Sequence, residues 1–193
     1  MDERKKAIKY RVWTTLIVVL LFAIASTIGV IYWLNSGVMK LSARITEDMQ
    51  SVKTLVSDVT VTDSGVKVYG YTKSVTVNGA NAEIQTVVGK LTPNSLDYQE
   101  TVDYAFAEGI DKNELFKLNV SGYLADYKEE NGVVTGLVRK NNVGKFFGSK
   151  DLIASTDAPV RMVFDESDNL TSLTLEFSLE SGKILTLTAT YTY

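Results

Sequence analysis

The side chains that could carry chemistry in this chain are mainly carboxylates, because its 193 residues include no histidine and no cysteine. This composition excludes thiol nucleophiles, histidine general bases, disulfides, lipidation at cysteine and Cys/His metal sites. Two carboxylates can still hydrolyse a glycosidic bond where both face one cleft. The clustered acids fall instead opposite apolar residues of predicted strands or in turns: Asp97, Glu100, Asp103 and Glu108, and Asp126, Glu129 and Glu130. Because this is typical of a solvated strand face, we predict no catalytic residue and no enzymatic activity.

Two shorter patterns could bind or attack a ligand, and each has a simpler interpretation. Asp165, Ser167 and Asn169 place oxygen atoms at alternate positions, as a calcium loop does, but the glycine and distal glutamate of such a loop are missing. A turn between two strands explains the same residues. Ser64 and Lys67 have the spacing of a catalytic serine–lysine pair, which begins a helix in the enzymes that use it but falls in a predicted hairpin here. We therefore predict neither a metal nor a cofactor.

The first element that would position a site is an uncharged segment, residues 12–34. As a helix it is long enough to cross a hydrocarbon core of about 30 Å. The only two tryptophans, Trp13 and Trp33, lie at its two ends, and aromatic rings favour the headgroup level of a bilayer. We predict a transmembrane helix with these two residues at its membrane edges, so that the bilayer is the first partner of the chain.

The charges around this segment predict its orientation. Residues 1–11 hold five Lys and Arg, whereas residues 35–48 hold only Lys40 and Arg44. The positive-inside bias places the short tail, residues 1–11, in the cytoplasm and the rest outside a single-pass membrane protein. A cleaved signal peptide ending at Ala23-Ile24-Ala25 is the alternative, but the apolar run continues past Ala25 for nine residues, which favours an uncleaved anchor.

The segment after the anchor, residues 35–57, predicts a juxtamembrane amphipathic helix. Asn35-Ser36-Gly37 interrupts the apolar run, and apolar residues then recur at three- and four-residue steps from Val38 to Val56. This stripe could form a coiled coil between two chains or pack on the domain that follows, and we favour packing within the chain.

Residues 58–193 predict an extracytoplasmic β-rich domain of about nine strands. Apolar and polar residues alternate along most of it, and Asn78-Gly79 and Asn131-Gly132 are hairpin signals. Residues 96–106 predict one long or bulged strand, with a helix over 95–107 as the alternative. A short helix is expected near 111–118, and a loop or short helix near 141–150. The fold class is α+β and mostly antiparallel, a curved sheet covered by the amphipathic helix.

Aromatic residues are frequent in this domain, and most share the apolar parity of their strands. Core packing accounts for most of them, but a curved sheet with an aromatic lining could also enclose an apolar ligand. The candidate lining residues are Tyr104, Phe106, Phe164, Phe177 and Tyr191.

The order of elements resembles the extracytoplasmic lipid-carrier fold of the LolA and LppX type. The matching stretches are residues 51–55 leading into 59–71, and residues 158–170 leading into the final hairpin. The resemblance implies a half-barrel around a helix and an apolar ligand, and it carries over no binding residue.

Two functions therefore remain open. The chain is either a membrane-anchored binding module for a lipid or another apolar ligand, or a non-enzymatic structural or accessory subunit of a membrane or cell-surface assembly. Residues 35–193 carry 15 Lys and Arg against 21 Asp and Glu, which argues against nucleic acid as a partner.

Overall fold

The computed structural model describes residues 2–34, 36–91, 98–109, 116, 118–146 and 152–193. The chain forms two compact units, residues 1–40 and 41–193. The first contains helix α1 (Asp2–Leu34) and the start of helix α2 (Gly37–Ser51), and the second contains the rest of α2 and a β-rich domain.

Helix α1 extends through the short basic tail and the uncharged segment without a break. Side chains along α1 are described for Thr15 and residues 17–33, and the large apolar ones among them are mostly exposed, from Ile17 (52% exposed) to Trp33 (53%). Among the described residues, no single helix is long and apolar enough to meet the criterion for a membrane span, whereas Ile17–Trp33 and Gly37–Ser51 meet it jointly. The transmembrane helix stays a prediction.

Helix α2 starts where the sequence predicts a break. The backbone N–H of Met39 bonds to both the carbonyl and the hydroxyl oxygen of Ser36, which satisfies a donor that a helix start would leave free. Leu41, Ile45 and Met49 recur every four residues and are at most 3% exposed. The apolar stripe is therefore buried within this one chain, as we favoured over a coiled coil.

The helix is shorter than predicted. It ends at Ser51, and strand β1 begins at Thr54, so Leu55 and Val56 are strand residues and not the last turn of the helix. The reason is that Thr54–Asp63 pairs with a strand on each side. The backbone hydrogen bonds and side-chain packing of these two pairings stabilise a strand more than the helical spacing of Leu55 and Val56 stabilises a helix.

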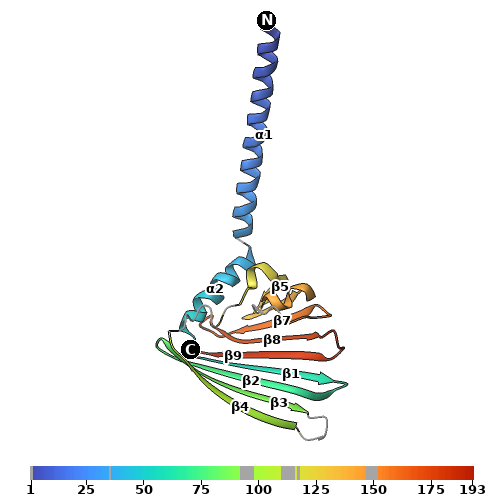
Figure 1. Ribbon diagram of the computed structural model, residues 1–193. Helices are drawn as coiled ribbons and strands as arrows, with labels where there is room; N and C mark the ends of the chain where they lie inside the picture. The colour runs from blue at the N-terminus through green and yellow to red at the C-terminus, as the bar shows by residue number, and fades with distance from the viewer. Residues whose placement is uncertain (1, 35, 92–97, 110–115, 117, 147–151) are drawn as a thin grey trace. The chain divides into compact units, whose positions relative to one another are not determined.

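Nine antiparallel strands form one unclosed sheet in the order β4-β3-β2-β1-β9-β8-β7-β6-β5. Figure 1 shows this sheet as a curved layer with β4 at one edge. The first strand thus pairs with the last, and two meanders, β1–β4 and β5–β9, join along that pair. The strands are β1 (Thr54–Asp63), β2 (Val66–Asn78), β3 (Asn81–Leu91), β4 (Tyr98–Ala107), β5 (Leu124–Glu130), β6 (Val133–Val138), β7 (Ala158–Phe164), β8 (Leu170–Ser178) and β9 (Ile184–Thr192).

The hairpin signals of the sequence are confirmed. Gly79 and Gly132 have φ values of 65° and 72° at the β2–β3 and β5–β6 turns, a conformation that glycine adopts without steric cost. Residues 66–78 form one strand, where the alternation over residues 66–71 and over residues 75–77 predicts two. Residues 98–107 are a strand in regular register with β3, which excludes the helical alternative.

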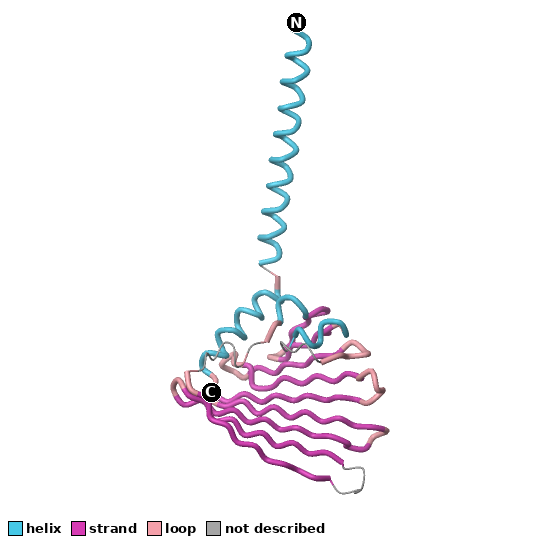
Figure 2. The backbone as a smooth tube through the Cα atoms, in the orientation of Figure 1, coloured by secondary structure: helices cyan, strands magenta, loops and turns pink. Residues whose placement is uncertain are grey.

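Short helices fill the connections of the second unit (Figure 2). They are α4 (Val120–Tyr123), a 3-10 turn (Lys140–Asn142) and α5 (Val143–Phe146). The helix start predicted at Asp111–Glu114 lies outside the described residues, as does the end of the predicted 141–150 helix.

The core lies on one face of the sheet, which we call the inner face. Directly paired residues in an antiparallel sheet point to the same side, so the strand register shows which residues lie on the inner face. Leu175 pairs with both Val160 and Leu187, and Leu173 pairs with Met162 and Ala189. All but Leu187 are at most 4% exposed. The opposite outer face of β9 carries Thr186, Thr188, Thr190 and Thr192, as the strict alternation of the sequence predicts.

Polar contacts hold α2 to the β-rich domain. The Arg44 guanidinium donates to a Glu129 carboxylate oxygen on β5 at 3.0 Å and to an Asp168 oxygen in the β7–β8 turn at 2.9 Å. The central carbon of the Arg44 guanidinium lies 3.8 Å from the centre of the Phe164 ring. The Asp48 carboxylate accepts the backbone N–H of Leu170 at 3.2 Å. Together with the buried stripe, these contacts fix the Leu41–Ser51 part of the helix on the β5–β8 end of the sheet.

Candidate inner-face pocket

An open cavity of about 190 Å³ lies on the inner face where β1, β2, β8 and β9 meet the segment after β4. Seven of its ten lining residues are apolar: Leu55, Val75, Phe116, Leu118, Leu173, Leu187 and Ala189. The other three are Ser57, Lys73 and Tyr191. Apolar walls with a few polar groups are typical of a site for a small apolar or amphipathic ligand.

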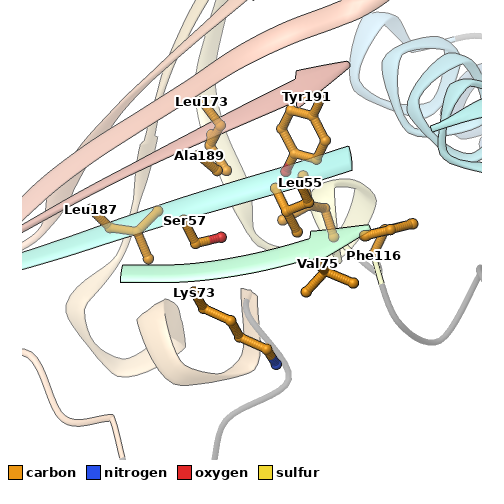
Figure 3. A pocket seen from close by; sticks show the side chains of 10 residues that line it. Leu55, Ser57, Lys73, Val75, Phe116, Leu173, Leu187, Ala189 and Tyr191 are labelled. Atoms are coloured by element: carbon orange, nitrogen blue, oxygen red, sulfur yellow. The ribbon is translucent and has the colours of Figure 1, made fainter. Parts of the chain in front are cut away.

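The register of three strands places these side chains. Leu55 on β1 pairs with Val75 on β2 and with Tyr191 on β9, which makes one row across the sheet. The next row contains Ser57, which pairs with Lys73 on one side and with Ala189 on the other. Figure 3 shows Leu55, Val75, Phe116 and Tyr191 grouped together, with Ser57 and Lys73 beside them. The cavity therefore has an apolar end and a polar end.

Phe116 closes the apolar end from outside the sheet. It is 3% exposed although it lies in a connection between β4 and α4, and it shares the lining with Leu118. Burial of this ring removes apolar surface from water and holds the connection against the inner face.

Tyr191 is the buried polar group of the lining, 5% exposed. Burial raises the pKa of its hydroxyl well above the ordinary value, with a smaller contribution from Tyr193 nearby. The Tyr191 hydroxyl is therefore neutral at any physiological pH, and it can donate or accept a hydrogen bond without adding charge to the apolar end.

The five predicted lining residues separate into three groups. Tyr191 lines the cavity. Phe164 and Phe177 are 6% and 2% exposed and belong to the packed core of the inner face, and Arg44 covers the Phe164 ring. Tyr104 and Phe106 lie on β4, where they are 65% and 57% exposed.

Tyr104 and Phe106 do not line the pocket because they lie on the opposite face of the sheet. Tyr104 pairs with Gln85 and Phe106 with Glu83, whereas the inner-face residue Val75 pairs with Ile84, one position out of phase. Both aromatic residues therefore point to the outer face. The inner face of β4 carries Ala105 and Ala107, which leave space where bulky side chains were expected.

The remaining lining residues gave only weak signals in the sequence. Leu55, Val75, Leu187 and Ala189 have the alternation of any half-buried strand, and nothing local tells which of them border a cavity. Phe116 and Leu118 fall in the predicted short helix of 111–118. Only the pairing of β1 with β9, which joins distant parts of the chain, brings these groups together.

The predicted membrane-edge residues are both in α1. Trp33 is 53% exposed and Tyr32 beside it is 82% exposed. For Trp13 the helical backbone is described and the side chain is not.

None of the other candidate reactive groups is assembled into a site in the described part of the chain. Glu100 faces the outer side of β4 and Asp103 the inner side, so the two carboxylates diverge. No described charged residue is buried, and no three described Asp or Glu residues gather closely enough to hold a metal. The Ser64 hydroxyl donates to the Asp63 carboxylate in the β1–β2 turn.

The Asp165–Asn169 segment is a turn, as the simpler interpretation expected. One Asp165 carboxylate oxygen accepts the backbone N–H groups of Ser167 and Asn169, both at 2.9 Å. These bonds, that from Asn169 above all, lower the pKa of the Asp165 carboxyl. The carboxylate thus satisfies the turn's own donors, which is the usual role of aspartate in such turns.

Some solved structures are similar to this chain, although their sequences are only distantly similar. No family model matches the chain, and no curated protein matches its sequence. The lipoprotein LppX from Mycobacterium tuberculosis is 12% identical, over 78% of this chain and 90% of that one, with a TM-score of 0.38. LprF from Mycobacterium bovis is 11% identical, over 80% of this chain and 92% of that one, with a TM-score of 0.43.

A third similar structure is the dehydratase domain from the terminal module of the rifamycin polyketide synthase. It is 8% identical, over 81% of each chain, with a TM-score of 0.23. LppX, whose type the order of elements resembles, is among the solved structures to which this chain is similar. The function of this chain is argued below from its own residues.

Proposed function

We propose that this chain is a membrane-anchored, non-enzymatic binding module that holds an apolar ligand, such as a lipid, in the inner-face pocket. The observation that carries the proposal is the open cavity of about 190 Å³ with a mainly apolar lining. A well-packed sheet would fill such a space with its own side chains, so a cavity open at an apolar wall favours a ligand over a purely structural role.

Anchoring is the second part of the proposal. The uncharged segment 12–34, its two tryptophans and the basic tail support a single-pass helix with the N-terminus in the cytoplasm. The exposed apolar side chains from Ile17 to Ile31 suit an environment of lipid. The β-rich domain would then lie on the extracytoplasmic side of the cell membrane, close to a source of apolar ligand.

Native mass spectrometry of the full chain, purified from cells, tests the binding activity. We expect a lipid-sized adduct at one copy per chain. Ser57→Trp places a bulky ring in the pocket and should remove the adduct. Thr60→Trp is the matched control, because Thr60 lies on the same strand and points to the outer face, so its adduct should persist. A wild-type chain without an adduct, or loss of the adduct in both variants, would overturn the proposal.

A structural subunit is the second candidate function, and the outer face of β4 favours it. Val102, Tyr104 and Phe106 are 57–65% exposed on an edge strand, and exposed apolar groups beside unpaired backbone are typical of contact surfaces. A photo-crosslinking residue at position 104 would join one defined partner protein in cells if this function holds, whereas the same residue at position 135 on the outer face of β6 would not. An adduct-free chain with a crosslink at 104 would decide for this second function.

A further inference from the structure

We propose that the inner-face pocket selects an anionic amphiphile, a molecule with an apolar chain that ends in a carboxylate or a phosphate, and that Lys73 binds its charged end. This inference rests on the proposed function, because it names the class of ligand for the same pocket. It depends on the charge and position of one lysine within an apolar lining.

Among the described residues that line the cavity, Lys73 is the only charged one. Its side chain is half-buried, and among the described residues no carboxylate lies within 4.0 Å of its ammonium group. The ion pairs described in this unit are made instead by Arg44, Arg139 and Lys183, none of which lines the cavity. A positive charge beside an apolar cavity is stabilised when a ligand supplies the opposite charge.

Neighbouring hydroxyl groups complete a cradle for an anion. Ser57 is directly opposite Lys73 on β1, and Thr86 is directly opposite it on β3, so all three side chains leave the inner face in one row. Side chains in such pairs have Cβ atoms about 5 Å apart. The ammonium donates up to three hydrogen bonds and each hydroxyl one, which suits a headgroup with two or more oxygen atoms. The nearest acid in that row, Asp103, pairs with Thr86 and is one strand further from the cavity.

The apolar end of the cavity lies in the next row. Leu55, Val75 and Tyr191 lie one pleat repeat along the strands from Ser57, Lys73 and Ala189, and Phe116 closes that end. An amphiphile whose charged group meets Lys73 can therefore direct its chain along Val75 and Leu55 toward Phe116. The neutral Tyr191 hydroxyl adds no competing charge to that route.

Photolabelling of the full chain in nanodiscs of phosphatidylcholine tests the charge selection. The probes are a diazirine-bearing fatty acid and its methyl ester, which differ in charge and share the same chain. In the wild type we expect the acid to label peptides of the pocket about tenfold more than the ester or better, since one charge-assisted hydrogen bond is worth at least about that factor. Lys73→Gln should bring the ratio close to one, and Lys73→Arg, which keeps the charge, should preserve a preference.

Lys128→Gln is the matched control, because Lys128 lies on the outer face of edge strand β5 and its loss should leave the ratio unchanged. Equal labelling of the wild-type pocket by acid and ester, or a preference that Lys73→Gln does not alter, would overturn the anionic class while leaving an apolar ligand in place. No pocket labelling by either probe would overturn the proposed function itself.

Inorganic phosphate in the millimolar range is the second arm, and it separates an amphiphile site from a simple anion site. We expect it to leave the acid labelling unchanged, because a free anion gains nothing from the apolar end. Suppression of the labelling by inorganic phosphate would overturn the inference.

Discussion

Among the described residues, Arg44 makes most of the polar side-chain contacts between α2 and the β-rich domain. It contacts the Phe164 ring and two carboxylates, from Glu129 and Asp168, and its own side chain is 21% exposed. Its Nε and second terminal nitrogen are shielded from solvent with no hydrogen-bond acceptor among the described residues. The cation–π contact with the Phe164 ring therefore has to offset part of the free energy that these two nitrogen atoms lose on leaving water.

Arg44→Met should lower the free energy of unfolding by about 1–2 kcal/mol, since it keeps the apolar stem and removes the charge-assisted bonds and the cation–π contact. Urea unfolding of the full chain in detergent micelles, followed by the far-ultraviolet circular dichroism of the sheet, measures the change. Tryptophan fluorescence would not serve, because both tryptophans lie in α1. Arg161→Met, at an exposed site on the outer face of β7, is the control and should change stability by less than about 0.5 kcal/mol. Equal losses in the two variants would contradict this role of Arg44.

Tyr127 gives the fold a pH dependence on the alkaline side. Burial, followed by donation of its hydroxyl to the Glu129 carboxylate, raises the pKa of Tyr127 to about 12. Above pH 10, the ordinary pKa of tyrosine, the unfolded chain loses this proton while the folded chain keeps it. The unfolded state then binds fewer protons, so stability should fall as the pH rises from 10 to 12.

Tyr127→Phe should make that fall shallower, because one of the groups that cause it is gone. Urea unfolding at pH 8, 10, 11 and 12 measures it, with each protein normalised to its own stability at pH 8. Tyr191 and Tyr193, whose pKa values are also raised by burial, should keep a residual fall in the variant. Curves for wild type and variant that stay parallel from pH 8 to 12 would contradict the assignment.

Among the elements, the β5–β6 hairpin leaves no room for a side chain at Gly136. A Cβ atom at Gly136 on β6 would lie 2.6 Å from the Leu124 Cδ1 atom and 3.0 Å from the Ala125 carbonyl oxygen on β5. The Leu124 side chain can rotate, but the carbonyl belongs to the paired strand and cannot move without disturbing the ladder next to the β5 bulge between Ala125 and Lys128.

Gly136→Ala should therefore destabilise the domain by about 1–3 kcal/mol, a typical cost of overpacking. Gly122→Ala is the matched control, because it lies in helix α4 with no heavy atom within 4 Å of the added Cβ, and it should be neutral or slightly stabilising. Thermal unfolding of the full chain followed by circular dichroism compares the two. A Gly136→Ala protein as stable as Gly122→Ala would contradict the close approach.

The elements that depend on local signals were predictable from the sequence. Alternation along residues 173–193 predicts the β8–β9 hairpin, and the Asn-Gly turns predict the β2–β3 and β5–β6 hairpins. The four-residue steps from Leu41 to Met49 predict the buried face of α2. The end of α2 was not predictable, because Leu55 continues the helical spacing and only pairing with Val75 and Tyr191 assigns it to a strand.

The candidate site was predictable only in part, for a similar reason. Alternation shows that Tyr104 and Phe106 share a face but not which face is inner, and on an edge strand that depends on the register with β3. Lys73 was not recognised as a site residue, because a lysine within an alternating strand usually marks the solvated side. Its neighbours across the sheet, Ser57 and Thr86, identify it as a pocket residue.

At the scale of the whole molecule, the central expectation is that residues 1–11 and the β-rich domain lie on opposite sides of a membrane. The absence of cysteine makes this directly measurable with single introduced cysteines, Lys6→Cys in the tail and Lys128→Cys in the β-rich domain. A membrane-impermeant maleimide added to intact cells should label position 128 and spare position 6, and both should react after the cells are lysed. Labelling at position 6 in intact cells would reverse the proposed orientation.

The pairing of β1 with β9 has a consequence for biosynthesis. Nine residue pairs join Thr54–Thr62 to Ile184–Thr192, and the Lys53 N–H bonds to the Thr192 carbonyl at 2.8 Å. Strand β1 near the centre of the sheet thus pairs with the strand that is synthesised after the other eight. A chain that leaves its export channel N-terminus first therefore cannot join its two half-sheets until β9 has emerged, and a product cut before Ile184 would leave those half-sheets separate and open to proteases.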